Sequence, residues 1–206
     1  MLADLTMKDF MKELASNSPI PGGGSIAAMC GSTGCNLVAM VAALTVGKKG
    51  YEEYWDEMAK LKADMEAISD EQLKAIDDDA NAYATVVGCF SMPKNTEEEK
   101  ALRAKTIQEK TEEAAQVPLG IAERAVPIFN GAREVIAKGN KNAVSDGAIA
   151  AMMARTAILG ALYNVRINAV SLKDEAKKAA LLKRCEELEK LAQEEEADIL
   201  KTVVFK

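Results

Sequence analysis

Histidine is absent from the 206 residues of this sequence. The absence excludes Ser-His-Asp and Cys-His catalysis, His-ligated zinc, and a proton shuttle built on imidazole, the side chain that ordinarily titrates near neutral pH. Any proton transfer must therefore use carboxylates, lysine, tyrosine or cysteine.

Cysteine is present, but not in the spacing of a metal or disulfide site. Cys30, Cys35, Cys89 and Cys185 form no Cys-x-x-Cys pair, so we interpret them as small buried hydrophobic residues in a reducing compartment and expect no metal site. The N-terminal residues also lack a basic region followed by an apolar run. We therefore expect no signal peptide and a cytoplasmic location.

Aromatic residues make up only 4% of the chain, and 5 prolines and 13 glycines punctuate it. Helix formers dominate and no strand-like alternation is present, which predicts an all-α fold. We expect a single domain over residues 1–206, folded as a bundle of about six helices, some of them long and kinked. The net charge of −6 argues against a nucleic-acid partner, because phosphate neutralisation needs clustered Lys and Arg.

Capping and turn residues indicate the helix boundaries. Thr6, Ser25, Ser145 and Asp174 are candidate N-caps, and Thr96 with Glu99 has the spacing of a capping box. Pro118 and Pro127 are expected to kink or briefly break the fourth helix. The expected helices run from Thr6 to Leu14, from Ile26 to about Val46, from Glu52 to Phe90, from Thr96 to the Gly139-Asn140 stop, from Ser145 to about Leu172, and from Asp174 towards the C-terminus.

Residues 26–46 carry no charge over a length that could span a bilayer. The stretch is rich in Ala, Gly, Ser and Thr, whose apolar strength is low, so a buried helix in close contact with its neighbours is favoured over a membrane span. This stretch and the nearly all-apolar stretch 149–170 present more hydrophobic surface than the amphipathic helices between them can cover. That excess predicts an obligate homodimer.

The third expected helix places one carboxylate on a packed face. At about 100° per residue, a stripe that must face a core includes Met65, Ile76, Tyr83, Val87 and Phe90. Asp79 falls inside this stripe among alanines, whereas Asp77 and Asp78 lie to its side or opposite it and are expected to be solvated. Burial would raise the pKa of Asp79 towards the range of a general acid or base. A buried structural Asp paired with Asn or Lys is the equally weighted alternative.

Two further patterns are candidates for ligand contact. On the helix that follows Ser145, one stripe carries Asp146, Asn164 and Asn168 on a surface otherwise made of Ala, Gly and Met. This stripe suits either a flat ligand or a buried helix contact. Pro21-Gly22-Gly23-Gly24-Ser25 at a helix start resembles an anion cradle, with a glycine turn that permits tight packing as the alternative.

Taken in order, six segments resemble the cyclodeaminase/cyclohydrolase family of folate enzymes. Each segment is short, but together they span nearly the whole chain. The segments are Ser18-Pro-Ile-Pro-Gly-Gly-Gly-Ser25, Leu44-Thr-Val-Gly-Lys-Lys49, Asp78-Asp-Ala-Asn-Ala-Tyr83, Met92-Pro-Lys-Asn-Thr-Glu-Glu-Glu-Lys100, Gly139-Asn-Lys-Asn-Ala-Val-Ser-Asp146 and Asn164-Val-Arg-Ile-Asn168.

The resemblance implies an all-helical dimer that binds a tetrahydrofolate in a cleft near the subunit contact, with no cofactor beyond that substrate and neither a nucleic-acid nor a membrane partner. It implies Asp79 as the catalytic carboxylate and Lys94 as a cationic contact in the catalytic site. The residues that it places in the folate-contacting cleft are Pro21, Gly22, Gly23, Gly24, Ser25 and Asp146, and Asn164 and Asn168 match the family's paired asparagines.

The activity expected from this resemblance is hydrolysis of 5,10-methenyltetrahydrofolate to 10-formyltetrahydrofolate. The one-carbon unit of that substrate is an amidinium cation, which needs no metal to make it electrophilic, and one carboxylate could move the protons. Formimidoyltetrahydrofolate cyclodeaminase activity and, as a non-enzymatic alternative, a helical dimerisation protein stay open. Lys48, Lys49 and Lys94 could hold the anionic glutamate tail, although solvated surface lysines are the alternative for any one of them.

Overall fold

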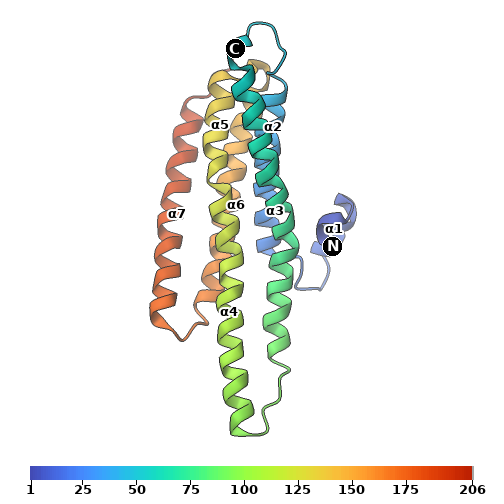
Figure 1. Ribbon diagram of the computed structural model, residues 1–206, viewed down its shortest axis with the longest axis vertical. Helices are drawn as coiled ribbons and strands as arrows, with labels where there is room; N and C mark the ends of the chain where they lie inside the picture. The colour runs from blue at the N-terminus through green and yellow to red at the C-terminus, as the bar shows by residue number, and fades with distance from the viewer. Residues whose placement is uncertain (206) are drawn as a thin grey trace.

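The computed structural model describes residues 1–205 and consists of an elongated bundle of helices (Figure 1). Its α-helices are α1 (Met7–Leu14), α2 (Gly23–Ala43), α3 (Trp55–Cys89), α4 (Glu97–Ala125), α5 (Pro127–Lys138), α6 (Val144–Ala169) and α7 (Glu175–Lys201). Short 3-10 helices cover Leu2–Asp4, Glu52–Tyr54 and Lys141–Ala143, and residues 1–205 contain no strand. The all-α prediction is confirmed.

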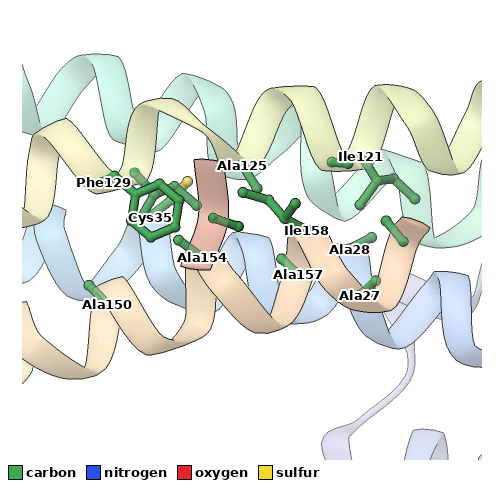
Figure 2. Packing of buried hydrophobic residues seen from close by; sticks show 14 of the residues in the cluster. Ala27, Ala28, Cys35, Ile121, Ala125, Phe129, Ala150, Ala154, Ala157 and Ile158 are labelled. Carbon is green, nitrogen blue, oxygen red and sulfur yellow. The ribbon is translucent and has the colours of Figure 1, made fainter. Parts of the chain in front are cut away.

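The core lies where α2 and α6 pack against each other and against their neighbours. α2 contacts α3 and α6, and α6 also contacts α4, α5 and α7. Alanines such as Ala28, Ala154 and Ala157 are fully buried there, and Figure 2 shows Ala154 near the ring of Phe129 and Ala157 near the side chain of Ile158. Small side chains let the helix backbones approach closely, and Gly34 marks one such approach: a Cβ at this position would lie 3.3 Å from the carbonyl oxygen of Ala150.

The two prolines of the predicted fourth helix behave differently. Pro127 is the first residue of α5, where a missing N–H costs nothing, and so the expected helix divides into α4 and α5. Pro118 lies inside α4. A proline there cannot donate to the carbonyl four residues earlier, and the Nδ2 of Asn168 donates to that carbonyl, on Ala114, at 3.0 Å.

Three helix starts are confirmed and two are wrong. Thr6 and Asp174 cap α1 and α7, and Thr96 forms the predicted capping box with Glu99. By contrast, α2 begins at Gly23, so Ser25 lies in its first turn and does not cap it. α6 begins at Val144 after a 3-10 turn, which places Ser145 inside the helix. In both cases the chain reaches helical conformation before the hydroxyl residue.

The region before α1 corrects the prediction for Asp77. Its carboxylate accepts hydrogen bonds from the backbone N–H of Leu2 at 2.6 Å and of Ala3 at 3.2 Å, and the side chain is half-buried. The helical wheel placed Asp77 away from the core, but a wheel contains no information on segments far along the chain that cover a helix side. Asp78 is exposed, as predicted.

The apolar stripe of α3 is core only over its first part. Met65 and Ile76 are buried, but Tyr83, Val87 and Phe90 are 47%, 45% and 54% exposed. Figure 1 shows the reason, since α3 and α4 extend as a hairpin beyond the ends of the other helices. The prediction that the whole stripe faces a core is therefore wrong for its last three members, and also for Leu73, which belongs to the stripe and is 38% exposed.

Two helical stretches, Gly23–Ala43 and Lys141–Ala169, are long and apolar enough to cross a membrane by length and composition alone. About half of each is buried inside the bundle, at 56% and 50%, as in the core helices of many proteins. Among the residues that are not buried, each helix carries one stripe of uncharged side chains, and we call the two stripes together the α2/α6 face. Its members are Ile26, Met29, Cys30, Thr33, Leu37 and Met40 on α2 with the C-cap residue Leu44, and Ile149, Met152, Thr156, Leu159, Tyr163 and Ile167 on α6 with the C-cap residue Val170.

Candidate functional site

A pocket of about 620 Å³ lies between the start of α2, the middle and end of α3, the first half of α4 and the end of α6. Apolar residues of α3 and α6 line much of it, together with the backbone around Gly22 and Gly23. The polar side chains in the lining are Asp79, Tyr83, Gln108, Thr111, Asn164, Asn168 and Ser171. Asp79 is the only charged residue among those that line it, so a cationic group that enters this pocket meets a single carboxylate.

Asp79 lies on α3 directly against the first turn of α2. A Cβ added to Gly24 would lie 2.0 Å from Oδ1 of Asp79, a distance that no real Cβ contact allows. Only glycine therefore permits the carboxylate to approach the α2 backbone at this point. The space that Asp79 occupies therefore explains the last glycine of the Gly22-Gly23-Gly24 turn.

Ser25 is the hydrogen-bonding partner of Asp79. Its Oγ lies 3.2 Å from Oδ2 of Asp79 and 3.0 Å from the carbonyl oxygen of Ile76. Burial raises the pKa of the Asp79 carboxyl, and hydrogen bonds from the hydroxyl and backbone N–H of Ser25 partly offset that rise. The result is a half-buried carboxyl group that can exchange a proton more readily near neutral pH than a solvated aspartate can.

The two asparagines of α6 enter the same pocket and are each held through the amide nitrogen. Nδ2 of Asn164 donates to the carbonyl of Gly160 at 2.9 Å, and Nδ2 of Asn168 donates to that of Ala114 at 3.0 Å. This use of both amide nitrogens orients the side chains, and it leaves the amide oxygens as acceptors for N–H groups of a ligand. The structure therefore brings Asp79, Gly22, Gly23, Asn164 and Asn168, which the family resemblance implied as site residues, to the lining of one pocket.

Gln108 is a lining residue that sequence reasoning missed. Its Nε2 donates to the carbonyl of Ser171 at 3.0 Å, and its Oε1 accepts from the N–H of Lys173 at 2.7 Å, which ties α4 to the end of α6. A glutamine in a strongly charged helix is typical of a solvated surface, so the sequence contained no signal for this contact.

The remaining predicted site residues lie elsewhere. Pro21 is buried, and Gly24 and Ser25 lie behind Asp79 rather than in the lining. Lys94 is in the exposed segment between α3 and α4 and does not line the pocket, so its role stays a prediction. Asp146 is 18 residues before Asn164 on α6, a rise of about 27 Å, and the chain does not bring it to this pocket. A shared stripe sets the angle around a helix axis, not the position along it.

Two other features bear on ligand binding. Lys48 lies at the far end of α2 from Gly23, where its Nζ donates to Oδ1 of Asn140 at 2.7 Å, so the structure does not place it at the pocket. No group of three Cys, Asp or Glu side chains is placed to hold a metal ion in the part of the chain that the structure describes.

The amino-acid sequence is similar to those of known proteins. Residues 6–187 match the family described as formiminotransferase-cyclodeaminase. The chain is 38% identical over 188 residues to a methenyltetrahydrofolate cyclohydrolase of Methylorubrum extorquens, with 91% of this chain and 90% of that protein covered. It is 33% identical over 174 residues to the formimidoyltransferase-cyclodeaminase of Rattus norvegicus, with 84% of this chain but only 32% of that longer protein covered.

A solved structure shows the same fold. The crystal structure of a formiminotetrahydrofolate cyclodeaminase from Thermotoga maritima superposes with a TM-score of 0.87 at 27% sequence identity, and 98% of each chain is covered. This chain therefore shares its fold, including the helices around the pocket, with a solved relative over nearly the whole length of both chains.

Proposed function

This chain belongs to the formiminotransferase-cyclodeaminase family, and from that premise we propose that it hydrolyses 5,10-methenyltetrahydrofolate to 10-formyltetrahydrofolate. The observation that carries the proposal is the pocket with Asp79 as its only charged lining residue, since the reacting carbon of this substrate belongs to a cation. The similarity over nearly the full length to a stand-alone methenyltetrahydrofolate cyclohydrolase supports the choice of reaction.

Asp79 has two tasks in the proposed reaction. Its ionised form stabilises the amidinium cation in a pocket that is otherwise uncharged. The same carboxylate accepts a proton as water attacks the bridging carbon, and the rise in its pKa on burial makes it a better base for that step than a solvated aspartate. Ser25 positions the carboxylate through Oδ2.

The second half of the reaction returns a proton to the folate. As the tetrahedral adduct opens, its hydroxyl proton is lost to solvent, the bond between the carbon and N5 breaks, and the protonated Asp79 donates to N5. Counted at the one-carbon unit alone, the sum is an amidinium cation plus water giving a neutral formyl group on N10, a neutral N5–H and one proton. Both steps use one carboxyl group, which agrees with the lack of a second charged group in the lining.

The cyclodeaminase reaction is the second candidate, and the fold shared with a solved cyclodeaminase favours keeping it. There N10 attacks the formimidoyl carbon of 5-formimidoyltetrahydrofolate, ammonia leaves, and the same carboxyl group supplies the proton to the leaving nitrogen. An assay that offers both folates to the purified protein separates the two. We expect loss of the methenyl chromophore without added metal or nucleotide, whereas ammonia release as the only activity would assign the cyclodeaminase reaction instead.

We also propose that the protein works as a homodimer in the cytoplasm. The α2/α6 face carries no charged residue, although the charged residues Arg155 and Arg166 of α6 pair with Glu196 and Glu189 of α7 on another side of the helix. An exposed face of this kind fits a second copy of the chain. Where two such faces meet with their α6 helices antiparallel, the Asp146 end of one copy lies towards the Asn168 end of the other.

A further inference from the structure

Arg103 differs from every other arginine of the chain. The sequence contains six arginines, and five of them, namely Arg124, Arg133, Arg155, Arg166 and Arg184, pair with a glutamate. Arg103 has no carboxylate partner within residues 1–205, and its Nε is buried without an acceptor. A guanidinium group held in this way is available to an anion that the chain itself does not supply.

The local sequence explains why Arg103 is unpaired. Glu99 precedes it by four residues on α4, which is the spacing at which a glutamate and an arginine normally pair on a helix. The capping box uses that carboxylate instead, because Oε2 of Glu99 accepts from the backbone N–H groups of Asn95 at 2.6 Å and Thr96 at 3.1 Å. The natural partner of Arg103 is therefore engaged at the start of the helix.

The position of Arg103 is set by Phe90, which lines the pocket. Nη2 of Arg103 donates to the carbonyl of Phe90 at 3.2 Å, and its guanidinium carbon lies 5.7 Å from the centre of the Phe90 ring. These contacts hold a half-buried cation against Phe90, outside the lining of the pocket but next to the end away from Asp79. Along α3 the rise from Asp79 to Phe90 is about 16 Å, and the residues between them that line the pocket are uncharged.

We propose that Arg103 binds a carboxylate of the glutamate tail of the folate, and so sets the direction in which the substrate lies in the pocket. The inference rests on the proposed function. With the cationic one-carbon unit at Asp79, the aminobenzoyl ring lies along the uncharged wall near Tyr83 and Val87, and the tail reaches Phe90 and Arg103. The pocket thus has a carboxylate in its lining at one end and a cation next to its lining at the other, and these charges match the two ends of the substrate.

The test compares two substrates and three variants. Methenyltetrahydrofolate carries the glutamate, and the corresponding methenyltetrahydropteroate lacks it. We expect Arg103→Gln to raise KM for the first substrate by about 10- to 100-fold, the range for loss of a charge-assisted bidentate contact, and to leave kcat nearly unchanged. The KM for the truncated substrate should not change. Lys105→Gln is the matched control, since Lys105 is an exposed cation on the same helix that pairs with Glu109.

Arg103→Lys keeps the charge and the packing of the stem but loses the planar fork, and should give an intermediate KM. It also carries the test if Arg103→Gln does not fold. Equal effects of either substitution on both substrates would overturn the assignment of Arg103 while leaving the proposed reaction standing. A wild-type protein that converts neither substrate would overturn the proposed function, and this inference with it.

Discussion

Asp79 and the residues that touch it make up the smallest unit on which the proposed function depends. Gly24 leaves the space that the carboxylate occupies, and Ser25 holds one of its oxygens. The free energy of unfolding is lowered by placing an ionised carboxylate in this half-buried position, because burial raises its pKa. Chemistry and stability are therefore opposed at this residue, and substitutions should separate them.

The first prediction concerns Asp79→Asn. The amide is nearly isosteric, so turnover should fall by about 100-fold or more through loss of the proton carrier, while folate still binds. Because the pKa of Asp79 is raised in the folded state, the stability contributed by its protonated form is present below the ordinary carboxyl pKa and is lost as pH rises through the raised value. The variant should lack this loss, so its Tm at pH 7 should equal or exceed that of the wild type.

Turnover at pH 7 and thermal melts over a pH series that rises from below the ordinary carboxyl pKa check both parts. Asp78→Asn is the control, since Asp78 is the adjacent but exposed aspartate and should change neither quantity much. Near-normal turnover in a folded Asp79→Asn protein would remove this residue from the mechanism.

The second prediction concerns Gly24→Ala. The new Cβ would have to displace the Asp79 carboxylate, because it would otherwise lie 2.0 Å from Oδ1. A displaced catalytic group should lower kcat by about tenfold or more. Gly88→Ala on α3 is the matched control: nothing lies within 4 Å of its added Cβ, and it should stabilise the helix by about 0.5–1 kcal/mol. Equal kcat values for Gly24→Ala and the wild type would contradict this account of the glycine turn.

At the scale of helices, α4 and α6 are joined at the point where α4 lacks one of its own backbone hydrogen bonds. Pro118 removes the donor that would otherwise pair with the carbonyl of Ala114, and Asn168 of α6 supplies the replacement. Gln108 makes a second connection between α4 and the end of α6. Both links lie in the wall of the pocket, so the same polar side chains that connect these helices also shape the site.

A double-mutant cycle tests the first link. Asn168→Ala should leave the buried carbonyl of Ala114 without a donor and lower the free energy of unfolding by about 1–3 kcal/mol. In a Pro118→Ala background the helix again provides its own N–H, so the cost of Asn168→Ala should be smaller. Chemical denaturation of the four proteins measures the coupling. Costs that are equal in the two backgrounds would show that Asn168 does not act through this carbonyl.

At the scale of the whole molecule, the two most apolar helices lie at the centre of the bundle and yet each keeps an exposed stripe. Met152, Tyr163 and Ile167 on α6 are 40%, 67% and 67% exposed. Packing within one chain does not explain apolar side chains on the outer sides of these two helices. The α2/α6 face is therefore the basis for the proposed dimer.

Met152→Glu tests the dimer directly. A charge within a contact between two apolar faces should dissociate the dimer, which sedimentation at micromolar concentration would detect as a shift to monomer. Lys183→Glu, an exposed charge change on α7, should leave the association unchanged. A wild-type monomer at that concentration would contradict the proposal outright.

Most of the helical framework could be predicted from the amino-acid sequence. Composition and periodicity were sufficient for the all-α class, and the caps at Thr6, Thr96 and Asp174 lie where their side chains and spacing predicted. The position of Asp79 on a packed face also followed from periodicity alone. These features are local, because they depend on residues within one or two helical turns of each other.

The contacts between side chains of different helices could not be predicted, because they depend on how the helices pack. Asp77 is covered by the chain before α1, Asn168 is matched to a carbonyl exposed by Pro118, and Arg103 is left unpaired beside Phe90. A helical wheel gives the angle of a residue around one axis. It contains neither the position of that residue along the bundle nor the identity of the helix opposite, and those two quantities separate Asp146 from the pocket that contains Asn164.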